Sequence, residues 1–94
     1  MNRRFVLAID NATKEQQNVV TNYFKNQMGY WHWFGDIWLL TNSRGLWNVT
    51  NIRDKVQELL PGVDMVVLEV ESDTDWAGFG PKDNFKWLHD TWKD

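Results

Sequence analysis

The chain has 94 residues, no cysteine and a formal net charge of −3. This length suffices for one domain with its own hydrophobic core, and the absence of cysteine excludes a disulfide framework and a thiolate metal site. A negative net charge argues against a protein whose main task is to grip a long nucleic acid. Seven tryptophans are the unusual feature of the composition.

No segment approaches the roughly 18 consecutive apolar residues that a membrane span requires. The apolar run at residues 5–9 is short and ends in Asp10, so a secretory signal peptide is not expected. We therefore expect a cytoplasmic protein without a membrane partner.

The first two predicted elements are a strand and a helix. Residues 5–9 are apolar on both faces, which is typical of a strand that is covered on both sides. Thr13 and Gln16 have the spacing of a capping box at the start of a helix. Val20 and Phe24 belong to the apolar stripe of that helix.

Residues 28–42 predict a β-hairpin with a two-residue turn at Gly35-Asp36. Glycine at the first turn position is typical of a type II′ turn. An in-register hairpin places Trp33 opposite Trp38, and opposed residues share a face of the sheet. One face then carries Trp31, Trp33, Trp38 and Leu40, and the other carries Tyr30, His32, Phe34, Ile37 and Leu39.

A second helix is predicted from about Thr50, with an apolar face at i, i+4, i+7 and i+8 formed by Ile52, Val56, Leu59 and Leu60. Pro61-Gly62 ends it, and residues 64–71 indicate a fourth strand. The order β-α-β-β-α-β predicts a ferredoxin-like α+β fold with an antiparallel sheet and both helices on one face. From right-handed crossovers we expect the first and fourth strands at the centre.

Residues 72–94 extend the core of residues 3–71 within a single domain, residues 1–94. Trp76 and Phe79 lie in a Gly-rich aromatic loop. A short helix is predicted after it, because apolar residues recur at i, i+3 and i+7: Phe85, Leu88 and Trp92. Such a stripe has to pack against another surface.

The two helices bury only one face of the sheet, so the aromatic residues on the opposite face must be buried by another surface. At roughly 150–250 Å² per aromatic side chain, the residues of this opposite face would expose on the order of 400–700 Å². The largest apolar patch on a typical monomer covers about 300–600 Å². We expect the C-terminal helix and a second copy of the chain to cover this face together, which predicts a homodimer or a higher oligomer.

Scattered residues over nearly the whole chain form a recognisable combination: Trp31-His32, Trp38, Ile52-Arg53-Asp54, a strand with an acidic end, Trp76, Phe79 and Trp87-Leu88. With these residues the chain resembles the SinR family of small bacterial and phage proteins, which resemble in turn the ferredoxin-like Cas-two (CRISPR-associated) and VapD proteins. The resemblance implies the fold and a tendency to dimerise. If a phage encodes the chain, its location is the host cytoplasm.

The resemblance to Cas-two proteins implies a role for one further residue. Asp10 matches an aspartate that is proposed in that family to hold a divalent metal between protomers. The basic segment that follows this aspartate in the family is absent, and Asn11-Ala12-Thr13 stands in its place.

Without the resemblance, Asp10 is typical of a turn or capping residue, because a hydrolytic metal site needs more than one carboxylate per ion or a symmetric mate. His32, between aromatic residues, is typical of a hydrogen-bonded core or interface histidine, and His89 shows no ligand spacing with it. We expect no cofactor and no metal, except at Asp10 if the protein is a nuclease.

Aromatic rings beside arginine suit a nucleobase and its phosphate, because bases stack on rings and guanidinium groups bind phosphate oxygens. Loop glycines also let backbone amides approach a phosphate. The candidate ligand-binding residues are Trp31, Trp33, Trp38, Arg44, Trp47, Arg53, Trp76 and Phe79. The alternative is that the loops pack their aromatic residues onto the core.

The sequence thus favours a non-catalytic oligomer that captures a small nucleotide-type ligand between protomers. A phage anti-defence protein that sequesters an immune signalling nucleotide of its host fits this description. The alternatives are a Cas-two-like metal-dependent nuclease and a scaffold that binds another protein through its aromatic face. The negative charge and the missing basic segment favour ligand capture, because a small ligand requires only one or two arginines.

Overall fold

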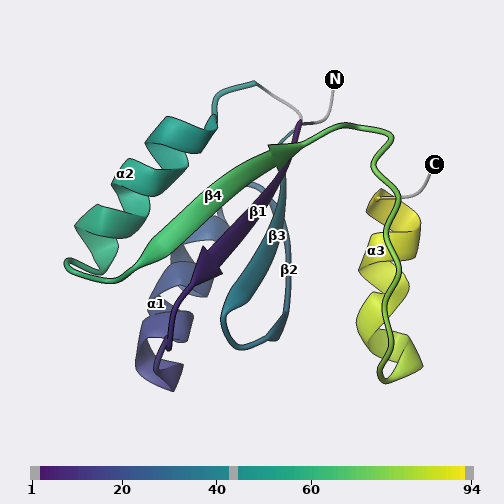
Figure 1. Ribbon diagram of the computed structural model, residues 1–94, viewed down its shortest axis with the longest axis horizontal. Coiled ribbons are helices and arrows are strands. Elements are labelled where there is room, and N and C mark those ends of the chain that lie inside the picture. The colour runs from purple at the N-terminus through teal and green to yellow at the C-terminus, as the bar shows by residue number, and fades with distance from the viewer. Residues whose placement is uncertain (1–2, 43–44, 93–94) are drawn as a thin grey trace.

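The computed structural model describes residues 3–42 and 45–92. They form three layers, with α1 and α2 on one face of a four-stranded sheet and α3 on the other (Figure 1). The elements in chain order are β1 (Arg3–Ile9), α1 (Lys14–Phe24), β2 (Gly29–Phe34), β3 (Ile37–Asn42), α2 (Val49–Leu59), β4 (Met65–Val70), the 3-10 helix η1 (Lys82–Phe85) and α3 (Lys86–Thr91). The antiparallel sheet and the element order confirm the expected ferredoxin-like α+β fold.

The strand order in the sheet is β2-β3-β1-β4. The expectation that the first and fourth strands are central is therefore wrong, because β1 and β3 lie at the centre and β2 and β4 form the edges. Each β-α-β connection joins two strands that are separated by one other strand. The β1–α1–β2 connection passes over β3, and the β3–α2–β4 connection passes over β1.

Both long helices begin at a capping box. The predicted one is present, since the Gln16 amide donates to Thr13 Oγ1 at 3.1 Å and the Thr13 amide donates to Gln16 Oε1 at 2.9 Å. Asn48 and Asn51 form a second, unpredicted box at the start of α2. Nowhere in residues 3–42 and 45–92 is a helix long and apolar enough to cross a membrane.

The β2–β3 hairpin contains a β-bulge, so its predicted register is wrong. Phe34 pairs with Ile37 beside the turn, as expected, but the partners then shift by one residue. His32 and Trp33 of β2 together lie opposite Trp38 of β3. An extra residue in one strand of an antiparallel pair gives this two-against-one arrangement.

The turn of this hairpin also differs from the prediction. A type II′ turn requires a positive φ at its first central residue. Among the described glycines the positive φ angles belong to Gly45, Gly62 and Gly80, so the turn at Gly35 is of another type.

The bulge determines which face of the sheet each tryptophan occupies. Beyond it, Trp31 pairs with Leu39 and lies on the α3 side of the sheet. Trp38 lies on the side of α1 and α2, where its Nε1 donates to Thr21 Oγ1 at 3.0 Å. The predicted grouping of Trp31 with Trp38 and Leu40 is therefore wrong, because one extra residue reverses the facing of all that follow it in the strand.

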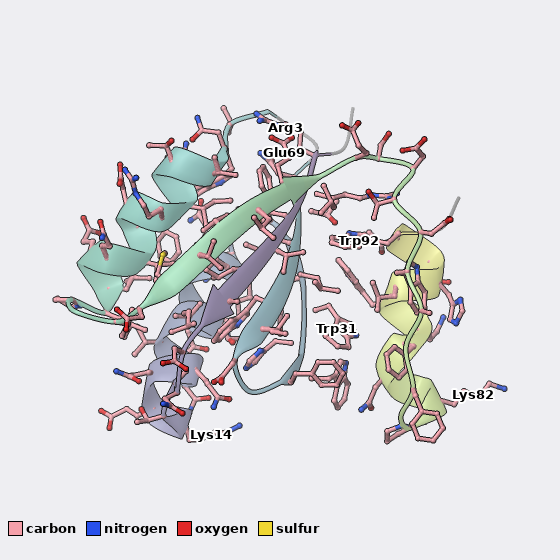
Figure 2. The ribbon with its side chains drawn as sticks, in the orientation of Figure 1. Arg3, Lys14, Trp31, Glu69, Lys82 and Trp92 are labelled. Atoms are coloured by element: carbon pink, nitrogen blue, oxygen red, sulfur yellow. The ribbon has the colours of Figure 1, made fainter. Side chains whose placement is uncertain are left out.

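The C-terminal segment forms the third layer and buries its predicted apolar stripe. Its buried cluster consists of Trp31, Phe85, Leu88 and Trp92. Figure 2 shows Trp31 from β2 and Trp92, just after the end of α3, pointing into the space between the sheet and α3. Trp31 Nε1 donates to the Asn84 carbonyl and Trp92 Nε1 donates to Thr41 Oγ1, each at 2.6 Å. These bonds fix the segment at both ends of its contact with the sheet.

Truncation of the buried stripe tests whether this layer contributes to folding. Leu88→Ala removes a side chain that is 3% exposed, so we expect the free energy of unfolding to fall by about 2–5 kcal/mol. Urea denaturation followed by tryptophan fluorescence measures the change. The matched control is Leu46→Ala, at a leucine that is 69% exposed, which should change the value by about 0.5 kcal/mol or less. Equal effects of both substitutions would mean that α3 does not pack on the sheet.

Candidate functional site

Trp33 is the tryptophan that the bulge turns away from both buried clusters. It is 59% exposed, and within residues 3–42 and 45–92 its ring has no aromatic contact and its indole N–H has no hydrogen bond. Bulges next to functional sites commonly redirect a side chain in this way. More than half of this large aromatic side chain is therefore accessible to a ligand.

Trp33 lines a groove of about 590 Å³ along the free edge of β2, which we call the edge groove. Its volume lies within the range of about 300–1,000 Å³ that is usual for small-molecule sites. Because β2 is an edge strand, one side of its backbone has no neighbouring strand. The remaining lining residues are Lys25, Met28, Gly29, Tyr30, Trp31, His32 and Trp87.

The edge groove combines elements that are far apart in the sequence. Lys25 follows the last turn of α1 and is exposed. Trp87 of α3 lies against β2, with its ring about 3.5 Å from where a Cβ at Gly29 would stand. The groove thus offers the indoles of Trp33 and Trp87, one ammonium group and the unpaired edge of a strand. A planar ring that carries an anionic group matches these features.

His32 fixes the inner side of the bulge. Its Nδ1 lies 2.9 Å from the carbonyl oxygen of Ile37, and its Nε2 lies 3.3 Å from Gln17 Oε1. The Gln17 amide nitrogen donates to the Ala12 carbonyl at 3.0 Å, which sets the orientation of the amide. The imidazole is stacked in parallel on Trp38 at 4.1 Å between centroids. His32, the residue before Trp33, thus joins α1 to the hairpin.

Burial lowers the pKa of His32 below the ordinary histidine value. The hydrogen bond to the Ile37 carbonyl works in the opposite direction, and the nearby charge of Lys14 lowers the pKa further. Since both ring nitrogens face oxygen atoms, only the protonated ring can donate to both. Hydrogen bonding therefore favours the imidazolium, whereas burial disfavours it.

The structure describes seven of the eight predicted ligand residues and does not bring these seven together at one place. Trp31 and Trp38 are buried, and each donates its indole N–H inside the protein, so neither has a free face for a base. Trp47 is half-buried, with its ring edge-on to those of Tyr23 and Phe24, and it belongs to the periphery of the core.

Of the two predicted arginines, the structure describes Arg53, which does not line the edge groove. Arg53 is exposed on α2 and forms an ion pair with Asp54 at 2.9 Å. Arg44 lies outside the described residues.

The aromatic loop before η1 lines a second groove, of about 490 Å³. Trp76 is stacked against Phe85 and lies 5.0 Å from the ring of His89, and its Nε1 donates to the Trp92 carbonyl at 3.0 Å. Phe79 is 99% exposed at the tip of the loop. Because the ring of Trp76 already contacts two rings of the protein, this groove is less suited to stacking than the edge groove.

Asp10 is exposed beyond the end of β1, where its amide donates to the carbonyl of Asp64 at 2.9 Å. Among the residues that the structure describes, no group of three or more histidines, aspartates or glutamates is placed to hold a metal ion. The nuclease hypothesis, which relies on paired Asp10 carboxylates, stays a prediction.

Sequence reasoning missed Lys25, Tyr30 and Trp87 as site residues. They come together only because α1, β2 and α3 meet at one edge of the sheet. The predicted stripe of the last helix consists of Phe85, Leu88 and Trp92 and does not include Trp87.

Comparison of the chain with family models, with curated proteins and with solved structures gave no match. The likeness to SinR-type proteins therefore depends on the individual residues given above, and the candidate site depends on its geometry.

The lowered pKa of His32 predicts a pH dependence of stability. The unfolded chain, with an ordinary histidine pKa, binds the proton more readily than the folded protein does. The stability contribution is therefore complete above the ordinary value and is lost as the pH falls from there toward the lowered pKa. We expect the free energy of unfolding to decrease between about pH 7.5 and about pH 5.5, and His32→Gln to reduce this slope. Denaturation curves across this range measure it.

His89→Gln serves as the control, because His89 is exposed on α3. A slope that disappears in His89→Gln and persists in His32→Gln would contradict the assignment to His32.

Proposed function

We propose that this protein is a non-catalytic binding protein that captures a small nucleotide-type ligand in the edge groove. The observation that carries the proposal is the exposed indole of Trp33 in a groove that Lys25 and Trp87 also line. Stacking of a base on an aromatic side chain contributes about 1–3 kcal/mol. Trp33 provides the stacking face, and Trp87 provides an apolar wall on the other side of the β2 edge.

Two polar features of the groove suit the rest of such a ligand. The ammonium group of Lys25 attracts a phosphate as a point charge. The free edge of β2 presents backbone N–H and C=O groups that have no partner strand. Donors and acceptors in alternation can pair with the edge of a nucleobase. The net charge of −3 is compatible with a ligand that carries few phosphates, because one or two cations are then enough.

Capture without turnover is the property that a sponge for an immune signalling nucleotide needs. The proposal therefore includes the role of a phage anti-defence protein in the host cytoplasm. The resemblance to SinR-type proteins supports a phage or bacterial source. A stoichiometric binder of this kind acts by lowering the free concentration of its ligand, so it must bind tightly and be abundant.

Isothermal titration of the full chain against cyclic and linear nucleotides tests the function. We expect saturable binding of at least one member of the panel. Recovery of that nucleotide unchanged, as judged by chromatography after incubation, supports capture without turnover. The absence of binding across the panel would reject the proposal, and conversion of the nucleotide would show an enzyme instead.

Substitution of Trp33 tests the site. Trp33→Ala removes the stacking face and should weaken binding about 5- to 150-fold, the equivalent of 1–3 kcal/mol. Phe79→Ala is the matched control, because Phe79 is an exposed aromatic residue that does not line the edge groove. Equal affinities of Trp33→Ala and the unmodified protein would place the ligand elsewhere.

Substitution of Lys25 tests the phosphate contact. Lys25→Gln should weaken binding of the phosphorylated ligand but not of its nucleoside. Lys86→Gln is the control, because Lys86 is exposed and forms an ion pair with Asp90 outside the lining of the groove. A loss of affinity that is the same for nucleotide and nucleoside would argue against a phosphate contact at Lys25.

A further inference from the structure

His32 contacts both the core of the hairpin and the edge groove. Its half-buried ring is among the residues that line the groove. The ring is also stacked in parallel on the buried Trp38, with 4.1 Å between the centroids, and Trp38 is held in turn by its bond to Thr21 of α1. This packing leaves the imidazole little room to move, so gain of a proton is the simplest way in which it can respond to a ligand.

Both nitrogens of the His32 ring face oxygen atoms that accept hydrogen bonds. Nδ1 lies 2.9 Å from the carbonyl oxygen of Ile37, and Nε2 lies 3.3 Å from Gln17 Oε1. A neutral imidazole has one N–H group, so it can donate to only one of these two oxygens. At the other position a lone pair of the ring then faces a lone pair of the oxygen.

Reversal of the Gln17 amide does not remove this mismatch. Gln17 Nε2 donates to the Ala12 carbonyl at 3.0 Å, and a reversed amide would place its oxygen against that carbonyl instead. Gly35 leaves space for this arrangement, since a Cβ there would lie 3.2 Å from Gln17 Nε2. Only the imidazolium ring makes every one of these contacts a pair of donor and acceptor.

The charged groups around His32 do not by themselves favour the imidazolium. Burial lowers the pKa of His32, and the charge of Lys14 on α1 lowers it further. β3 faces the ring with a backbone carbonyl and an indole, which do not titrate. The hairpin turn contributes the carboxylate of Asp36, whose Oδ1 accepts from the Ala12 amide at 3.1 Å. The ammonium group of Lys25 lines the groove itself.

We propose that an anion bound in the edge groove is captured together with a proton, which His32 takes from the solvent. The anion supplies a negative charge on the groove side of the ring, and both oxygen acceptors then receive an N–H. At up to about 10 Å and an effective dielectric constant of about 20, an opposite unit charge shifts a pKa by about one unit. His32 thereby becomes a second cation of the groove, in addition to Lys25. This coupling rests on the proposed function, because it concerns the ligand of the same groove.

The coupling selects ligands by their charge. A phosphate ester brings the proton with it, whereas an uncharged nucleoside does not. Because protonation favours binding of the anion, the affinity should rise as the pH falls through the pKa of the anion-bound state, and it should level off below the pKa of the anion-free state. A difference of one unit between these two pKa values corresponds to about a tenfold change in affinity.

Nuclear magnetic resonance of the His32 ring tests the coupling, with inorganic sulfate as the probe. Sulfate does not titrate where histidine does, and His89→Gln leaves His32 as the only histidine of the chain. We expect the pKa of His32 to be higher by about one unit in excess sulfate than in chloride at the same low ionic strength. Equal pKa values in the two salts would overturn the proposal.

Two lysine variants locate the anion. Lys25→Gln should abolish the difference between the two salts, because Lys25 lines the groove. Lys14→Gln should raise the pKa of His32 in chloride but keep the difference, because Lys14 acts on His32 through its charge and does not line the groove. A difference that persists in Lys25→Gln and disappears in Lys14→Gln would place the anion outside the groove and overturn the proposal.

Isothermal titration with a cyclic nucleotide, whose phosphodiester does not titrate near neutral pH, detects the proton directly. Near the ordinary histidine pKa, the apparent binding enthalpy should differ between two buffers of different ionisation enthalpy, and His32→Gln should remove this difference. Nucleotide binding without any buffer dependence would overturn the coupling and leave the proposed function standing. A sulfate-dependent pKa without binding of any nucleotide would support the coupling and reject the proposed function.

Discussion

The placement of His32 and Trp33 opposite the single residue Trp38 controls the distribution of aromatic residues in this protein. Without that extra residue, Trp31 and Trp38 would face the same layer. With it, Trp38 enters the core beneath α1 and α2, and Trp31 enters the cluster beneath α3. His32 holds the bulge from inside by stacking on Trp38 and by its contacts with Ile37 and Gln17. Trp33 is left for the solvent or for a ligand, so the same irregularity that divides the core also forms the edge groove.

Helices pack on both faces of the sheet, but the contacts that hold them there differ between the two faces. On the α1 and α2 side, most contacts are between aliphatic and aromatic residues, and Trp38 and His32 of the hairpin also contact Thr21 and Gln17 of α1. On the α3 side, indole N–H groups bind the segment at defined points, including the bond of Trp92 to Thr41. Directional bonds fix the position of a short helix that has little propensity to form alone. A segment anchored in this way covers part of the face and leaves Val66 and Leu68 of the edge strand β4 more than half exposed.

The sequence was sufficient to predict the features that depend on residues close together in the chain. The Thr13 capping box, the stripe of α3 and the order of helices and strands along the chain follow from spacings within a few residues or from the alternation of patterns. The bulge could not be predicted, because an in-register strand and a bulged strand have the same residues around the same turn. The positions of the central strands were missed because handedness alone does not say which strand fills the gap beneath each crossover. The edge groove depends on both features, and so Lys25 and Trp87 were not recognised as its residues.

The most direct test of this account is a nuclear Overhauser map of the β2–β3 hairpin in solution. The account predicts cross-strand contacts between Trp31 and Leu39 and between Phe34 and Ile37, together with contacts between the rings of His32 and Trp38. The contradictory result is a regular ladder in which Trp33 lies opposite Trp38 and Trp31 opposite Leu40. Trp33 would then share a face with buried residues, and neither the edge groove nor the two-sided division of the core would exist.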